Sequence, residues 1–113
     1  MNRSSRRTDL PLWHARTVDI VADLQLWALD RRYRLPGTGS RSMLFRFDDI
    51  EGQPMFGAVA TASDGRDFEP GRTFAGVHLW LWGDVEAHLT VEPGTRFVVW
   101  YGGDIGEGIV RSN

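Results

Sequence analysis

Apolar and polar residues alternate along residues 16–28. The even positions carry the apolar side chains Val18, Ile20, Ala22, Leu24, Leu26 and Ala28. Alternation with a period of two predicts a strand with one buried face. The alternative is a helix that begins at Thr17, although this interpretation places Asp23 and Gln25 poorly.

Five further segments have the composition of strands, and turn-forming residues separate them. They are residues 43–47, 55–61, 77–82, 96–101 and 105–110, with residues 85–91 as an additional candidate. The pairs Asp64-Gly65, Pro93-Gly94 and Gly102-Gly103 are typical of turns between strands. Short strands at this spacing predict an all-β barrel or sandwich.

The chain length of 113 residues, with 42% hydrophobic and 25% charged residues, fits one globular domain. We expect residues 1–15 to be a flexible basic tail with a short apolar hook at residues 10–13, and residues 16–113 to form a single barrel domain. The chain has no cysteine, which excludes disulfides and cysteine-bound metals. Neither a secretory signal nor an apolar run of about 20 residues is present, so we expect a cytoplasmic location without membrane contact.

Charge is distributed unevenly, although the formal net charge is only −2. All 13 basic residues are arginine; residues 1–34 carry a local charge of +3 and residues 35–113 a local charge of −5. Nucleic-acid binding draws much of its affinity from a basic face that neutralises phosphates. The acidic body therefore argues against RNA as the main partner.

Catalytic motifs find little support in the sequence. The group His78, Asp84, Glu86 and His88 could hold a metal across a hairpin, but turn acids and strand-surface histidines explain it better. No G-x-S-x-G motif is present, and Asp48-Asp49 lies in an expected turn. We expect no metal, no cofactor and no enzymatic activity. A small enzyme or ligand-binding barrel is the least favoured hypothesis.

An aromatic face is predicted on the strand at residues 77–82. Alternation places Val77, Leu79 and Leu81 on one side and His78, Trp80 and Trp82 on the other. If the aliphatic side fills the barrel, the rings point outward and form a contact for a protein partner or a second copy of the chain. Trp100 and Trp27 are candidates to extend this face. Cover by the apolar hook, and stacking of a small molecule, are the alternatives.

The final hairpin is specific enough to suggest a family. Residues 94–110 read G-T-R-F-V-V-W-Y-G-G-D-I-G-E-G-I-V, which resembles the G-L-R-F-A-I-R-E-G-G-R-T-V-G-A-G-V-V wording of the C-terminal (third) β-barrel domain of elongation factor Tu. Residues 45–52, F-R-F-D-D-I-E-G, resemble that family's F-R-T-T-D-V-T-G. The resemblance covers about residues 18–110 and implies a small closed antiparallel β-barrel. This chain has no lysine and no phosphate-binding loop, so it resembles that barrel without the GTPase module.

In that family the barrel contacts the T stem of tRNA. Carried onto this chain, the contacting positions fall near Ser42, on Glu51 and on Tyr101-Gly102. Glu51 stands where the family has threonine, and Tyr101 where it has glutamate, so the resemblance implies that the tRNA-facing chemistry has been replaced. We therefore predict a non-catalytic, stand-alone binding barrel that contacts a protein through His78, Trp80, Trp82 and Trp100. The alternative is an RNA-binding accessory of translation that adds the arginines Arg3, Arg6, Arg7, Arg31, Arg32 and Arg34.

Overall fold

The computed structural model describes residues 18–48, 52, 55–82 and 91–112, without the side chains of Val18 and Trp82. In these ranges the chain forms six strands, which are β1 (Val18–Leu26), β2 (Leu44–Phe47), β3 (Met55–Thr61), β4 (Thr73–Trp82), β5 (Arg96–Trp100) and β6 (Asp104–Ser112). The all-β expectation is confirmed, and the helical alternative for residues 16–28 is wrong. None of the described residues forms a helix that is long and apolar enough to cross a membrane.

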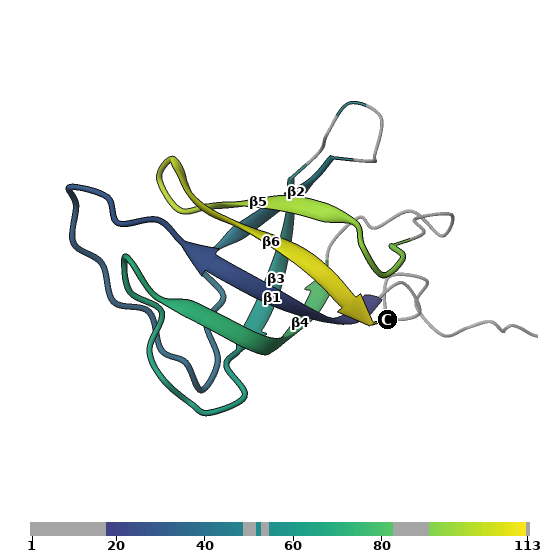
Figure 1. Ribbon diagram of the computed structural model, residues 1–113, viewed down its shortest axis with the longest axis horizontal. Helices are drawn as coiled ribbons and strands as arrows, with labels where there is room; N and C mark the ends of the chain where they lie inside the picture. Colours follow the sequence, from purple (N-terminus) through teal and green to yellow (C-terminus); the bar gives the residue numbers. More distant parts are fainter. Residues whose placement is uncertain (1–17, 49–51, 53–54, 83–90, 113) are drawn as a thin grey trace, which may run out of the picture.

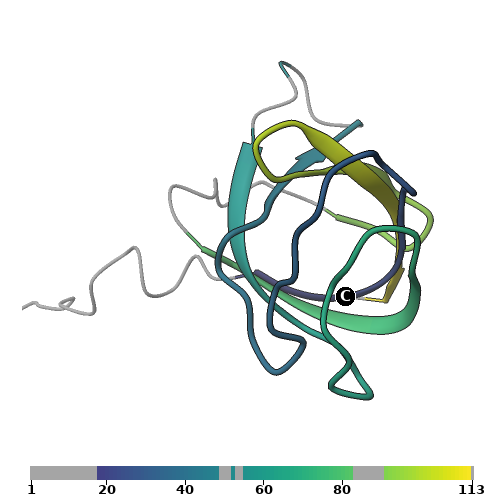
Figure 2. The same ribbon diagram turned by 90° about the vertical axis from the view of Figure 1, so that its left-hand side faces the viewer.

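The strands close into an antiparallel barrel with the ring order β1-β4-β3-β2-β5-β6. The first strand completes the ring, because β1 pairs with β4 on one side and with β6 on the other. Figure 1 shows β1 between β6 and β4, and Figure 2 looks into the barrel from its loop-bearing end. The expected small closed barrel is therefore present. Closure leaves few strand edges available for pairing with another chain.

Apart from Phe74, the side chains of β1 and β4 that fill the barrel interior are those that alternation predicts. On β1 the buried residues are Ile20, Ala22, Leu24 and Leu26, and on β4 they are Phe74, Val77, Leu79 and Leu81. Aromatic rings from β2 and β5 meet in the interior, where the Phe47 and Phe97 ring centroids are 5.3 Å apart. Removing these apolar surfaces from water is the main force that closes the barrel.

Two glycines on β6, Gly106 and Gly108, allow it to approach β1 closely. A Cβ atom on Gly106 would lie 2.5 Å from the backbone oxygen of Gln25, and one on Gly108 would lie 2.3 Å from Cζ of Phe97. No larger residue fits either position without movement of the backbone or of a core ring. These glycines therefore make the strongly curved wall of the barrel possible.

The predicted strand boundaries need correction at two places. β4 begins at Thr73 rather than at residue 77, because a β-bulge at Ala75 and Gly76 lets Phe74 and Thr73 pair with Leu24 and Gln25. Gly76 has a φ of 68°, which suits the extra residue of the bulge. β6 runs on to Ser112 rather than ending at residue 110. Of the additional candidate strand at residues 85–91, only Val91 is described, and it belongs to no strand.

Candidate binding surfaces

The outer wall of β4 carries an exposed tryptophan. Val77, Leu79 and Leu81 are fully buried, so the alternating positions His78 and Trp80 face outward, as expected. Trp80 is 52% exposed. The backbone of Trp82 continues the strand, but its side chain is outside the description.

Strand β3 adds apolar side chains beside Trp80. Val59 lies directly opposite Trp80 in the β3–β4 pairing, and such neighbours have Cβ atoms about 4.5–5.5 Å apart. Met55 lies four residues before Val59 on β3, on the same outward side of the strand, and is 41% exposed. Met55 and Trp80 are the two large hydrophobic residues that are exposed in the described part of the chain. Both lie on the outer wall of β3 and β4. We call the outward side chains of Met55, Val59 and Trp80 the Trp80 surface, in which Val59 adjoins Trp80 and Met55 lies four residues from Val59 along β3.

Polar contacts border the Trp80 surface on the β1 side. Asp19 of β1 lies opposite Trp80 in the strand pairing, and its Oδ1 atom contacts Nε2 of His78. The side chains of His78 and Asp19 are 46% and 65% exposed. A partner that covers Trp80 would therefore meet a polar rim at this side, the arrangement typical of protein interfaces.

Further along the same wall, Asp23 joins three strands. Its Oδ1 atom accepts a hydrogen bond of 2.9 Å from the backbone N–H of Gly76 in the β4 bulge. The same atom lies 2.8 Å from Nη2 of Arg111 on β6. Asp23 therefore holds the β4 bulge against β1 and β6 through its Oδ1 atom.

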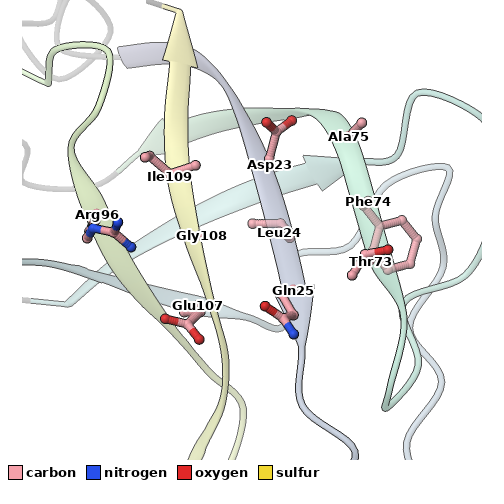
Figure 3. A pocket seen from close by; sticks show the side chains of 10 residues that line it. All are labelled: Asp23, Leu24, Gln25, Thr73, Phe74, Ala75, Arg96, Glu107, Gly108 and Ile109. Carbon is pink, nitrogen blue, oxygen red and sulfur yellow. The ribbon is translucent and has the colours of Figure 1, made fainter.

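A shallow groove of about 480 Å³ crosses β5, β6, β1 and β4 on this outer wall. In Figure 3 Arg96 and Glu107 line one side of it, Asp23 and Gln25 the middle, and Thr73 and Phe74 the other side. Its acids already have partners, because Glu107 accepts a hydrogen bond of 3.2 Å from the indole N–H of Trp27 and Asp23 binds Arg111. The groove thus presents Arg96, Gln25 and Thr73 as its polar side chains without a side-chain partner in the described residues, which is too little to define a ligand.

A second cavity, of about 570 Å³, lies among loops that precede β2 and β4. Its lining residues, which define what we call the arginine pocket, are Arg31, Arg32, Tyr33, Arg34, Glu69 and Pro70. Arg31, Arg32 and Arg34, which belong to the RNA-binding alternative predicted from the sequence, thus line the same cavity. Tyr101 and Gly102, from the turn between β5 and β6, lie beside Arg31, which donates a hydrogen bond to the backbone oxygen of Tyr101 and would be in ordinary contact with a Cβ on Gly102.

Ion pairs set the protonation of groups near the arginine pocket. Arg34 donates from Nε to Asp67 at 2.7 Å, and this hydrogen bond raises the pKa of Arg34. The same bond, with a second from the backbone N–H of Gly37, lowers the pKa of Asp67. Burial raises the pKa of the Tyr33 hydroxyl, while the charge of Arg31 acts in the opposite direction. Asp67 is therefore charged at neutral pH, and Tyr33 is neutral.

The remaining residues predicted from the sequence do not join these surfaces. Trp100 lies on β5, three strands away from β4 in either direction around the ring, so it does not extend the Trp80 surface. Trp27 follows the far end of β1 and contacts Glu107 instead. Ser42 is exposed in the loop before β2 and receives no contact from the arginine pocket. Glu51, Arg3, Arg6, Arg7 and the apolar hook lie outside the described residues.

Sequence reasoning missed Met55, Val59 and Tyr33 as members of these surfaces. Alternation within residues 55–61 puts Met55 and Val59 on one side, but only the pairing of β3 with β4 brings that side next to Trp80. Tyr33 has no local signal, because its neighbour Tyr101 is distant in the sequence.

The metal hypothesis involves Asp84, Glu86 and His88, which are outside the description. Among the residues that are described, no group of three His, Cys, Asp or Glu side chains could hold a metal ion.

Comparison with models of protein families, with curated proteins and with solved structures found no match for this chain.

Proposed function

We propose that the protein is a non-catalytic binding module whose barrel holds the Trp80 surface rigidly toward a protein partner. The observation that carries the proposal is the 52% exposure of Trp80 beside Val59, with the equally outward Met55 on the same strand as Val59. Tryptophan is enriched among the residues that dominate binding energy at protein interfaces. A tryptophan on a paired strand loses little conformational freedom on binding, which favours affinity.

The chemistry of the surface suggests what the partner presents. An apolar side chain would pack against Trp80, Val59 and Met55. At the rim, Asp19 is the more exposed member of the His78–Asp19 contact, and a basic group of the partner would complement it. A hydrophobic centre with a polar rim is the usual anatomy of protein interfaces.

The wider biological setting is part of the same proposal. The likeness of residues 94–110 to the final hairpin of elongation factor Tu supports a shared barrel type. The antiparallel ring of six strands and the φ of 67° at Gly102, in the Gly-Gly turn, are compatible with this kinship. The partner would then belong to the translation apparatus or be a factor that docks on that barrel, in the cytoplasm. RNA is the competing partner, and the experiment below separates the two.

The test is affinity capture from nuclease-treated lysate, followed by titration of the captured protein against purified barrel. Trp80→Ser removes the centre of the surface, and Trp100→Ser is the matched control because it makes the same change on the opposite side of the ring. We expect Trp80→Ser to weaken binding at least about 10-fold, as loss of a central interface residue does. Trp100→Ser should bind within about twofold of the wild type.

Two results would overturn the proposal. One is a captured protein that binds both serine variants equally well, since the contact would then lie elsewhere. The other is binding that disappears on nuclease treatment and falls steeply with salt, which would identify RNA as the partner. Thermal unfolding of each variant verifies that the barrel is intact before binding is compared.

A further inference from the structure

The arginine pocket contains a cation that has only neutral partners. Arg31 donates from Nη1 to the backbone oxygen of Tyr101 at 2.7 Å, in a partly buried bond. Its guanidinium carbon lies 5.4 Å from the ring centroid of Tyr101 and 5.7 Å from that of Tyr33. No carboxylate pairs with Arg31 among the described residues. A partly buried cation without a counter-ion is poised to accept an anion.

Two further arginines, Arg32 and Arg34, line the same cavity and have donors without a partner in the described residues. Arg32 is exposed and has no partner in the described part of the chain. Arg34 binds Asp67 through Nε, which leaves its two terminal amino groups without a partner among the residues that the structure describes. The one acid in the lining, Glu69, is engaged by Arg72 at 3.2 Å. Positive charge in the pocket is therefore balanced only in part.

The position of Arg31 is fixed before any ligand arrives. The rings of Tyr33 and Tyr101 meet edge to face, with centroids 5.9 Å apart, and Arg31 lies against both. The Arg31 guanidinium also lies next to Gly102 in the hairpin turn, where an added Cβ would be 3.4 Å from Nη2, an ordinary contact distance. A donor held in this way costs little entropy when it binds a ligand.

The geometry points to a site for the phosphate group of a small phosphorylated compound, bound by Arg31 together with Arg32 and Arg34. Guanidinium groups offer paired N–H donors that match phosphate oxygens. Arg31 and Arg32 together carry the two charges that a phosphate monoester needs at neutral pH. A carboxylate would be satisfied by one arginine, and this is why a phosphate fits the pocket better.

Titration of the purified full-length protein with inorganic phosphate, followed by NMR or calorimetry, tests this site. Acetate at equal ionic strength controls for general salt effects. We expect phosphate to bind with a Kd on the order of 1 mM and acetate to bind much more weakly. Arg31→Gln and Arg32→Gln should each raise the Kd at least about 10-fold. Arg41→Gln, which removes an exposed arginine that does not line the pocket, should leave it within about twofold.

Three results would overturn the inference. Phosphate that binds no better than acetate would exclude the site, and an equal loss in all three arginine variants would show a general charge effect. A single-stranded RNA oligonucleotide that binds strongly while inorganic phosphate does not would assign the arginines to a nucleic-acid surface instead. Arg32 is exposed, so its variant should fold even if Arg31→Gln does not. Because the titration contains no protein partner, its failure is separate from failure of the proposed function.

Discussion

The Tyr33 side chain combines useful ring contacts with a hydroxyl group that stabilises nothing. Its ring packs against Tyr101 and Arg31, but its oxygen is buried without a hydrogen-bond partner in the described residues. An unpaired buried hydroxyl costs about 1–3 kcal/mol. We expect Tyr33→Phe to keep the ring and to raise the free energy of unfolding by about 1 kcal/mol in urea titration. Tyr101→Phe is the control and should change it by less than about 0.5 kcal/mol.

The same variant should alter the response to alkali. Because burial raises the pKa of Tyr33 in the folded state, the unfolded chain releases this proton first as pH rises above about 10. The native state then binds more protons than the unfolded state, so stability falls as pH rises through that range. Tyr33→Phe should make this fall less steep. Identical slopes for the variant and the wild type between about pH 9 and 11 would show that Tyr33 titrates normally.

Gly108 is a residue whose lack of a side chain is required by the core. A Cβ there would lie 2.3 Å from Cζ of Phe97 and 2.8 Å from the backbone oxygen of Asp23. We expect Gly108→Ala to lower the free energy of unfolding by more than about 2 kcal/mol, as overpacking does. Gly65→Ala is the comparison, because Gly65 has a φ of 76° and open space around it. Its loss should be only about 1 kcal/mol, and equal losses at the two sites would contradict the packing argument.

Between elements, Asp23 ties the bulge of β4 to β1 and β6. Asp23→Ala would leave the Gly76 N–H without its acceptor and remove the contact with Arg111. We expect a loss of about 1–2 kcal/mol in chemical unfolding, mostly from the bond to Gly76, because exposed ion pairs contribute little. Gln25→Ala, on the same outward face and without a side-chain partner in the described residues, should change stability by less than about 0.5 kcal/mol. If Asp23→Ala left the free energy of unfolding unchanged, water would have to replace the carboxylate as the acceptor at the bulge.

The elements also show where sequence patterns are informative. Alternation identifies the inner residues of β1, from Ile20 to Leu26, because one face of a barrel strand must be apolar. It does not reveal that Thr73 and Phe74 belong to β4, since Gly76 reads as a break and the bulge depends on Asp23 of another strand. Alternation also predicts the outward position of Trp80, because Leu79 and Leu81 on either side of it are buried. Its neighbours are not predictable in this way, because Val59 reaches it through the non-local order β4–β3.

At the level of the whole molecule, ring closure decides which distant residues can act together. Trp80 and Trp100 both point outward from strands that are rich in aromatic residues, so alternation within each strand does not distinguish them. The ring order separates them by three strands in both directions, which no local signal contains. Conversely, closure of the β5–β6 turn over the loop before β2 brings Tyr101 to Arg31 and so creates the arginine pocket. Both binding proposals therefore depend on topology more than on motif.

Cover of the Trp80 surface by residues 1–15 is the alternative to an open binding face. Val18 pairs with Leu81 and Asp19 with Trp80, so the chain enters the barrel beside this surface. The segment between Trp13 and Val18 can span up to about 17 Å when extended, which is enough for the apolar hook to reach Trp80. If the hook filled the surface, a protein partner would have to displace it. Deleting residues 1–15 therefore separates cover by the chain itself from an open binding face.

We expect residues 16–113 alone to unfold with a free energy within about 0.5 kcal/mol of the full chain, since the described core begins at Ile20. The indole N–H signal of Trp80, assigned with Trp80→Phe, should keep its NMR position and its exchange rate with water. Affinity for the captured partner should stay within about twofold. Faster exchange at Trp80, tighter partner binding and lower stability after the deletion would instead show that the hook occupies the surface. The barrel would then be a self-covered module, and a partner would bind only after the first residues of the chain had moved away.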